Sequence, residues 1–295
     1  MFRLISIYRD DYLQFSGNGD QFKIQLAPFP ETVKNYFVET ARAAEEIHDL
    51  KQGDLHVMYS GGRDSEYALS VFLKLGIPVI PTVVSIGPYN QHDLSYAQAF
   101  CAQHKLTPKI IDIDFDQFVS SGKILETAVA MQSNVYHYSV LAHAVSQLDG
   151  TVICCDNEPY IKQYSDGWNI EMYEYDFAIP RHFINQGILG TPHFNIYTAE
   201  MMMAYLLDSQ MQSLARNEIP GKQGSHSSKH IVYNRHSDLF IRARSKRHGY
   251  EEMEQQEIFK HPVFAEFDKL RETWNGTYSV PYFEFLQKQN TRLVA

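Results

Sequence analysis

Residues 55–69 have the sequence LHVMYSGGRDSEYAL, and this stretch decides the fold. A short apolar run is followed by serines, two glycines and an aspartate, and then by an amphipathic pattern that ends at Gly76. The apolar run predicts a buried strand, the glycines predict a tight turn, and the remainder predicts a helix with a glycine at its carboxyl end. The unit is therefore a strand, a turn and a helix, and the turn raises a question of function.

The same alternation continues along the chain. Apolar stretches at 77–87, 107–115 and 151–155 predict three more strands. Helical patterns at 92–106 and 135–150 lie between them. Short apolar strands that alternate with helices are typical of a parallel sheet that is covered on both faces. The sequence therefore predicts a doubly wound α/β core.

A different pattern precedes this core. Residues 2–27 alternate apolar and polar side chains around Gly17, Asn18 and Gly19, which predicts a β-hairpin. Residues 31–50 then show helical spacing. We expect residues 1–50 to form an N-terminal hairpin and helix extension.

The part of the chain beyond about residue 190 is predicted to be mostly helical. The patterns at 198–215 and 250–261 are the clearest. Within the first of them, the methionines at 201–203 are expected to fill the core rather than to contact a ligand. We expect residues 51–295 to form one domain.

Composition excludes several classes of protein. Of 295 residues 44% are apolar and 21% are charged, as in an ordinary globular protein, and no apolar run is long enough to span a bilayer. Three cysteines make neither a disulfide framework nor a C-x-x-C zinc site. The first residues lack the features of a secretory signal, so we expect a cytoplasmic protein. A net charge of −9 makes nucleic acid a poor candidate partner.

Positive charge is nevertheless concentrated in one segment. Between Pro220 and Tyr250 there are seven lysines and arginines and one acid, Asp238. Such a block forms either a solvated face or a clamp for a phosphorylated ligand, and both alternatives are open at this point. The seven are Lys222, Lys229, Arg235, Arg242, Arg244, Lys246 and Arg247.

The turn between the first strand and the first helix has the chemistry of an anion site. Gly61 and Gly62 lack Cβ atoms, so their N–H groups can approach a ligand closely and their φ angles can be positive. The helix that follows directs its N-terminal N–H groups and its dipole at the same point, and Ser60 and Ser65 add hydroxyls. The sequence is not a Walker A loop, because no G-K-[ST] follows, and it is not a G-x-G-x-x-G dinucleotide loop.

Residues 60–65, S-G-G-R-D-S, resemble the S-G-G-x-D-S pyrophosphate loop of the N-type ATP pyrophosphatases, or PP-loop enzymes. That superfamily includes asparagine synthetases, GMP and NAD synthetases and tRNA-modifying enzymes. The resemblance implies an adenine nucleotide α-hydrolase-like fold and binding of the β,γ-pyrophosphate of ATP. Because an aspartate beside a polyanion needs a cation between them, Asp64 is also the first expected Mg²⁺ ligand. Its alternative role is to cap the helix. The implied ATP ligands are Ser60, Gly61, Gly62, Asp64 and Ser65.

A second stretch is similar to asparagine synthetases. Residues 81–114, PTVVSIGPYNQHDLSYAQAFCAQHKLTPKIIDID, match a strand end followed by an aspartate and a helix in that family. There, backbone groups around the strand end hold adenine. The resemblance implies this role for Ser85 and Ile86, with Met58 from the first strand. A simple core position is the alternative for Ile86.

The fourth predicted strand matches the family less well. Asparagine and β-lactam synthetases carry a G-x-G-x-D segment here, whereas this chain has TVICCDNEPYI at 151–161, without glycines. Asp156 and Glu158 still place carboxylates at the carboxyl end of the sheet, where ligands of open α/β folds bind. We assign Glu158 to Mg²⁺, and Asp156 to Mg²⁺ or to acid–base work on an attacking amine. A turn or helix-cap role is the alternative for both.

A lysine is expected to stabilise the charge that develops on the α-phosphate as pyrophosphate leaves. In asparagine and β-lactam synthetases a late lysine has this role. The segment IRARSKRHGYE at 241–251 is similar, so Lys246 is the first choice. Lys229 is the second, and Gly221 and Gly224 would let it move as part of a lid. An exposed surface loop is the alternative for that segment.

The resemblance implies an AMP-forming ligase that activates a carboxylate or carbonyl with ATP and Mg²⁺ for attack by ammonia or an amine. Full asparagine synthetases begin with a glutaminase domain, and only about 50 residues precede the synthetase-like region here. We therefore expect the nitrogen to come from free ammonia, an amine substrate or a separate nitrogen donor subunit. The alternatives are a nucleobase- or tRNA-modifying PP-loop enzyme and a non-catalytic ATP sensor.

The sequence does not name the activated acid. The region at 160–230 matches the family poorly, and its side chains either line a substrate pocket or pack in the core. The candidates there are Tyr160, Tyr164, Trp168 and Arg181.

Overall fold

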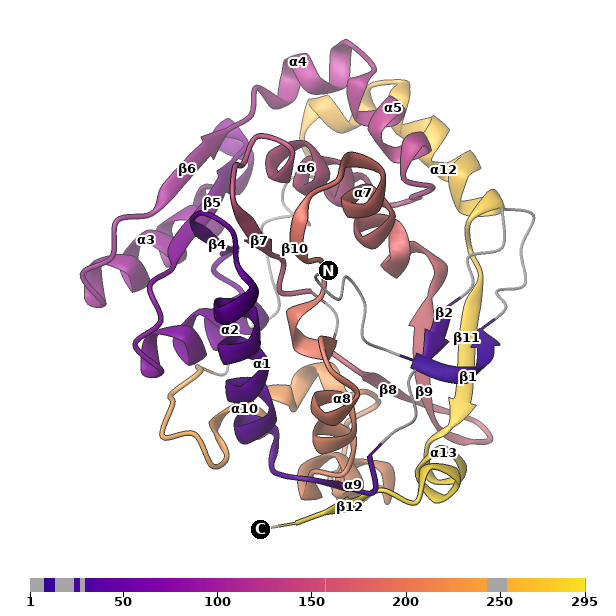
Figure 1. Cartoon of the computed structure of the whole chain (residues 1–295). Coiled ribbons are helices and arrows are strands. Elements are labelled where there is room, and N and C mark those ends of the chain that lie inside the picture. The colour runs from indigo at the N-terminus through magenta and orange to yellow at the C-terminus, as the bar shows by residue number, and fades with distance from the viewer. Residues whose placement is uncertain (1–7, 14–23, 27–29, 157, 243–253, 295) are drawn as a thin grey trace.

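The centre of the computed structural model is a five-stranded parallel sheet (Figure 1). Its strand order is β10-β7-β4-β5-β6, so the first core strand, β4, lies in the middle. The chain extends from β4 to β5 and β6, and then returns to the other side of β4 for β7 and β10. The predicted doubly wound α/β sheet is confirmed. The strands are β4 (Leu55–Met58), β5 (Ile80–Ser85), β6 (Lys109–Asp112), β7 (Thr151–Ile153) and β10 (Leu189–Thr191). The structure describes residues 8–13, 24–26, 30–156, 158–242 and 254–294.

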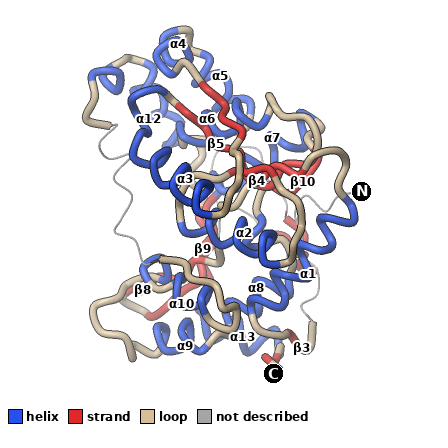
Figure 2. The backbone as a smooth tube through the Cα atoms, turned by 90° about the vertical axis from the view of Figure 1, so that its left-hand side faces the viewer, coloured by secondary structure: helices blue, strands red, loops and turns tan. Residues whose placement is uncertain are grey.

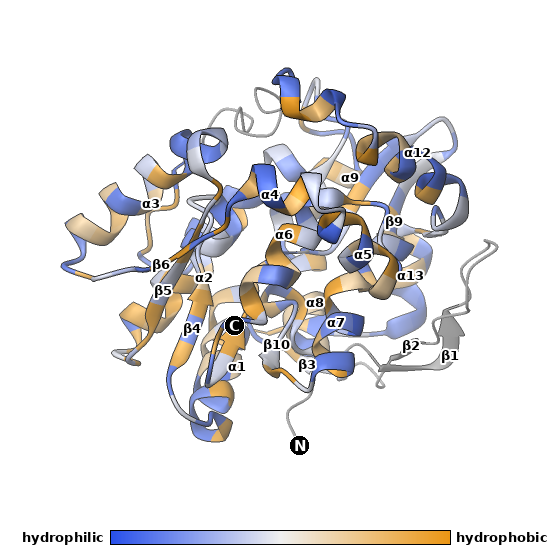
Figure 3. Cartoon of the chain, turned by 90° about the horizontal axis from the view of Figure 1, so that it is seen from above, coloured by the Kyte–Doolittle hydropathy of each residue, from blue (hydrophilic) through white to orange (hydrophobic). Residues whose placement is uncertain are grey.

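Helices cover both faces of this sheet and enclose an apolar core on each. Alternate strand residues point to opposite faces, so Ile153 of β7 joins one core and its neighbour Val152 joins the other. Figure 3 shows apolar residues along β4, β5 and α2 in the interior. One core contains residues of α1 (Tyr36–Leu50), α2 (Arg63–Lys74), α3 (Gln91–Gln103) and α8 (Ala199–Leu206). The other contains residues of α4 (Phe115–Ser120), α5 (Lys123–Ala130), α6 (Tyr136–Val145), α7 (Ala178–Gln186) and α12 (Val263–Thr273).

A second, antiparallel sheet of three strands was not predicted. Its order is β11-β9-β8, and β11 joins β9 from a distant part of the chain, with Thr277 opposite Tyr173. Figure 2 shows β8 and β9 below the parallel sheet, near α9, α10 and α13. The elements are β8 (Tyr160–Tyr164), β9 (Gly167–Tyr173), β11 (Thr277–Pro281), α9 (Ser209–Ala215), α10 (Lys229–Asn234) and α13 (Tyr282–Gln289).

The ends of the chain differ in detail from the expectation. β1 (Tyr8–Leu13) and β2 (Ile24–Leu26) pair antiparallel, while the predicted Gly-Asn-Gly turn lies outside the described residues. The predicted helix at 31–50 begins only at Tyr36, because the Asn35 side chain caps it and β3 (Thr32–Val33) pairs with β12 (Arg292–Leu293).

Two helical predictions in the C-terminal part have different outcomes. The methionines at 201–203 are buried core residues, as expected. The predicted helix at 250–261 is wrong in its described part, which forms only the 3-10 turn η5 (Glu257–Lys260). Within the described residues, no helix has the length and apolar character needed to cross a membrane.

Gly190 lies where an added side chain meets the neighbouring strand. Its φ is +135°, and an added Cβ would overlap the carbonyl oxygen of Val152. We expect Gly190→Ala to lower the free energy of unfolding by about 3 kcal/mol, because the backbone of β10 must move away from β7. Urea unfolding would measure the change.

Gly76→Ala is the matched control for this prediction. Gly76 has φ +69°, and an added Cβ would meet no atom within 4 Å. Only the cost of a left-handed alanine, about 1–2 kcal/mol, applies there. Equal losses in the two variants would contradict the steric argument.

Candidate active site

A cavity of about 1010 Å³ lies at the carboxyl ends of the central strands, between the parallel sheet and the β8–β9 hairpin. This is the crevice where a doubly wound sheet reverses its strand order, and ligands bind there in open α/β folds. The cavity brings together most of the residues that the sequence analysis selected. They are Met58, Ser60, Gly61, Gly62, Asp64, Ser65, Ile86, Asp156, Glu158, Tyr160 and Lys229.

The loop at 60–65 has the strand–turn–helix geometry that the sequence predicts. Gly61 has φ +72°, and a Cβ there would stand 2.8 Å from the carbonyl oxygen of Asp93. Gly62 caps α2 with an extended backbone, φ −81°, and no side chain caps this helix end. The hydroxyls of Ser60 and Ser65 lie 3.2 Å apart within the loop. The N-terminus of α2 therefore faces the cavity with its backbone donors.

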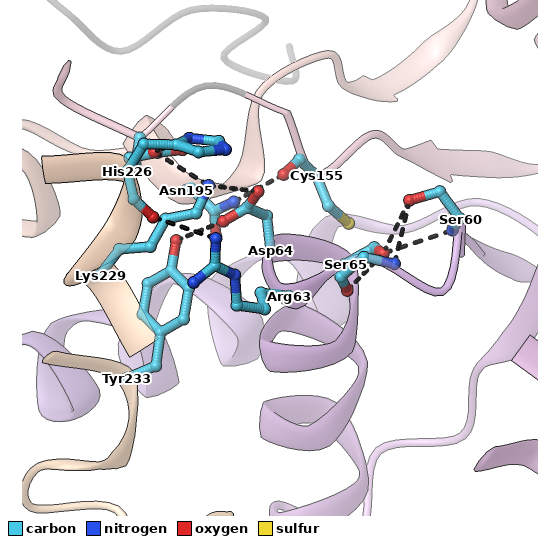
Figure 4. Close-up of polar contacts among 11 residues, drawn as sticks. Ser60, Arg63, Asp64, Ser65, Cys155, Asn195, His226, Lys229 and Tyr233 are labelled. Atoms are coloured by element: carbon cyan, nitrogen blue, oxygen red, sulfur yellow. Dashed lines mark hydrogen bonds and ion pairs between the residues drawn. The ribbon is translucent and has the colours of Figure 1, made fainter. Parts of the chain in front are cut away.

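Lys229 connects the two carboxylates that were assigned to Mg²⁺. Its Nζ donates to Asp64 Oδ2 at 2.6 Å and to Glu158 Oε1 at 2.9 Å, and its side chain is 1% exposed (Figure 4). Burial alone would raise the pKa of Glu158, but the ammonium and the nearby His226 outweigh it and lower that pKa. Burial likewise opposes the charge on Lys229, and the two carboxylates raise its pKa. These shifts favour the charged forms of both Glu158 and Lys229.

Tyr233 also holds Asp64, and the sequence analysis missed it. Its hydroxyl donates to Asp64 Oδ1 at 2.7 Å, so α10 supplies a donor to each oxygen of that carboxylate. Lys229 and Tyr233 are four residues apart and therefore share one face of the helix. The ring of Tyr233 stacks on Tyr67 of α2 at 4.4 Å between centroids. The i, i+4 spacing of Lys229 and Tyr233 was visible in the sequence, but nothing in the sequence indicated that both side chains bind Asp64.

The carboxylates fit the divalent cation that the resemblance implies. Asp64 and Glu158 already converge on one cationic nitrogen, so both can reach a single ion. Mg²⁺ is commonly held by one or two carboxylates together with substrate phosphates. Among the described residues no group of three or more His, Cys, Asp or Glu side chains could hold a metal by itself. Two carboxylates would leave the other ligand positions of such an ion to substrate phosphates and water.

Asp176 is a second residue that the sequence analysis missed. It lies in η2 (Glu174–Phe177) and lines the cavity. Burial raises its pKa to about 7, opposed by the hydrogen bond from the Tyr173 N–H and aided by the charges of Asp156 and Glu158. A carboxyl group with a pKa near neutrality can exchange a proton with an amine.

Other predicted residues lie elsewhere. Ser85 ends β5, where its carbonyl accepts from the Ile113 N–H, and it is not among the described residues that line the cavity. Trp168 donates to Asn217, and Arg181 donates to the Met131 carbonyl, so both serve packing rather than the cavity. Lys246 lies outside the described residues.

The basic block at 220–250 is not one solvated face. Lys229 is buried in the cavity wall, and Arg242 also lines the cavity. Arg235 instead pairs with Asp208 at 3.4 Å, on the side of α9. The described part of the block therefore divides between the site and the surface.

The chain is similar to known proteins in its fold but not in its sequence. No protein family model matches the chain, and no curated protein sequence matches it. Among solved structures, it is similar to an NH3-dependent NAD synthetase from Campylobacter jejuni, in complex with a nitrate ion, with 16% identity and a TM-score of 0.35. That match covers 79% of this chain and 90% of the synthetase chain. A likeness at this level carries no information about the function of the present chain.

Proposed function

We propose that this chain is an ATP-dependent adenylating enzyme that forms AMP and pyrophosphate. The activated group is a carboxylate or carbonyl, and the nucleophile is ammonia or an amine. One observation carries the proposal. A glycine loop before a helix N-terminus faces the same cavity as an aspartate and a glutamate that share one cation.

The loop at 60–65 would bind the β,γ-pyrophosphate of ATP. The free N–H groups at the start of α2 favour an anion, and the left-handed Gly61 turns the backbone around it. Met58 and Ile86, at the ends of β4 and β5, would contact adenine from the same side of the cavity. The nucleotide would then extend from β5 toward β4.

In the first step a carboxylate oxygen of the substrate attacks the α-phosphorus, and the bond to the oxygen that bridges to the β-phosphate breaks. Pyrophosphate carries away that electron pair, and negative charge develops beside Asp64 and Glu158. Lys229, buried between them, would offset this charge. With ATP bound, a Mg²⁺ ion that arrives with the phosphates would share these two carboxylates with Lys229 and would neutralise charge on the phosphates.

In the second step the amine attacks the acyl carbon of the adenylate, and AMP leaves with the former carboxylate oxygen. The attacking nitrogen must lose a proton. Asp176 would accept this proton, since its raised pKa makes it a stronger base than an ordinary carboxylate. Asp156, which follows β7 and lines the same cavity, is the other candidate for this role.

The test is a separation of products. The protein is incubated with Mg·ATP, ammonium and a pool of amino acids and small acids, and the nucleotides are resolved by chromatography. AMP and pyrophosphate are expected with the wild type and about 10³-fold less with Asp64→Asn. Formation of ADP and phosphate would refute the proposal. If ATP binds but stays intact with all substrates, including RNA, the sensor alternative is favoured.

The pH dependence of amide formation tests Asp176. Because the base must be ionised and its pKa is about 7, the rate should fall by about tenfold for each pH unit well below 7. Ammonia titrates in the same direction, so the informative quantity is the ratio of wild-type to Asp176→Asn rates. We expect this ratio to rise through pH 7 and then level off. A ratio that does not change with pH would exclude Asp176 as the base.

A further inference from the structure

The cavity has a second half that the nucleotide would not fill. With adenine near β5 and the phosphates at β4, the space toward β7 is left for the acid. Its wall comes from β8, β9 and η2, and the residues on it are mostly aromatic or acidic. They are Tyr160, Ile170, Glu171, Met172, Tyr173, Tyr175, Asp176 and Phe177.

Tyrosine rings form the flat part of this wall. The rings of Tyr173 and Tyr175 stack with 5.1 Å between centroids and an interplanar angle of 3°. Tyr138 of α6 lies 6.3 Å from Tyr175 and also lines the cavity. The faces of such rings carry partial negative charge and attract cations and flat groups.

A buried carboxylate is bound by the hydroxyl groups of two tyrosines on this part of the molecule. Glu171 is 3% exposed and accepts hydrogen bonds from the hydroxyls of Tyr164 and Tyr173. Lys162 approaches this carboxylate within 3.8 Å and stands 5.0 Å from the centroid of the Tyr164 ring. The aromatic and acidic face of β8–β9 therefore already holds one cation, beside the part that faces the cavity.

The charges of the cavity are unevenly placed. The three lysines and arginines among its described residues are Arg63, Lys229 and Arg242, and none of them belongs to the β8–β9–η2 wall. That wall contributes Glu171 and Asp176 instead, although Lys162 of β8, outside the cavity lining, approaches Glu171 within 3.8 Å. A second negative group on the substrate would meet like charge in a partly dry site, which is unfavourable.

We propose that this wall is the subsite for the activated acid and that it selects an acid whose far end is a flat, positively charged group. The carboxylate of such an acid faces the nucleotide, and its cationic end lies on Tyr173 and Tyr175, near Glu171. The inference rests on the proposed function, because that function places the nucleotide in the other half of the cavity.

Two acids of equal shape provide the test. In 4-guanidinobenzoate the group at the far end is a flat cation, and in 4-ureidobenzoate it is flat and neutral. Binding of each to the protein saturated with Mg²⁺ and a non-hydrolysable ATP analogue is measured by calorimetry. We expect the cationic acid to bind at least about tenfold more tightly. Equal affinities, or no binding of the cationic acid, would overturn the proposal.

Variants locate the effect on the wall. Glu171→Gln keeps the shape and removes the charge, and Tyr175→Leu removes a ring face. Each should reduce the preference for the cationic acid to about threefold or less. Asp166→Asn removes an exposed acid from the β8–β9 turn and should leave the preference unchanged. A preference that survives both wall substitutions would place the cation elsewhere and refute the assignment. If a variant does not fold, the comparison of the two acids on the wild-type protein still tests the proposal.

The two proposals can fail separately. If AMP and pyrophosphate form with some acid but the charged and neutral probes bind equally, adenylation stands and the cationic subsite is wrong. If the cationic probe is preferred but no acid yields AMP, the subsite stands and adenylation is wrong.

Discussion

Replacing Lys229 with methionine should lower the rate of pyrophosphate release by about 10³-fold, because the buried cation beside the leaving group is lost. It should also change how stability depends on Mg²⁺. Without Lys229, Asp64 and Glu158 face each other without the ammonium that they share, at a cost of about 3–5 kcal/mol in the absence of metal. A divalent ion between them should restore much of this loss. The wild type, which already holds a cation there, should respond less.

Urea unfolding with EDTA and with Mg²⁺ measures the stability effect, and a pyrophosphate assay measures the rate. Lys74→Met is the matched control, because Lys74 pairs with the exposed Asp238 at 3.7 Å. That exposed pair should contribute less than about 1 kcal/mol, whether or not Mg²⁺ is present. If Lys229→Met keeps the wild-type rate, Lys229 is not the cation that acts on the α-phosphate, and Lys246 becomes the next candidate.

Replacing Gly61 with alanine should weaken ATP binding by about 100-fold. The φ of +72° disfavours any residue with a Cβ, and that Cβ would meet the Asp93 carbonyl oxygen at 2.8 Å. The loop must shift to relieve the contact, and its N–H groups then no longer converge on the phosphates. Titration with a fluorescent ATP analogue, displaced by ATP, measures the affinity.

Gly122→Ala separates the loop effect from the general cost of a left-handed alanine. Gly122 has φ +76°, and an added Cβ would meet no atom within 4 Å. It caps the start of α5, away from the cavity. We expect the control to lose stability but to keep its affinity for ATP. If Gly61→Ala also keeps its affinity, the loop is not the phosphate site.

Most of the parallel sheet could be predicted because its signals are local. Each strand is one short apolar run, and each helix that follows has its own amphipathic pattern. Residues 55–76 are therefore enough to predict β4 and α2. The β8–β9 hairpin has a local signal, the Asp166-Gly167 turn, which was missed, whereas the third strand of the antiparallel sheet has none. Strand β9 is completed by β11, about a hundred residues later, and pairing over that distance leaves no trace in either segment alone.

The candidate site could likewise be predicted only where its signals are local. The sequence by itself determined the loop at 60–65, since the conformation of glycines and the start of a helix are local properties. It also selected Glu158 and Lys229, though only as separate candidates. The tertiary structure decided that Lys229 lies between Asp64 and Glu158, that Tyr233 joins them, and that Asp176 faces the same cavity. These groups come from segments far apart in the chain. Their charges interact strongly only when packing brings them together and removes the water between them.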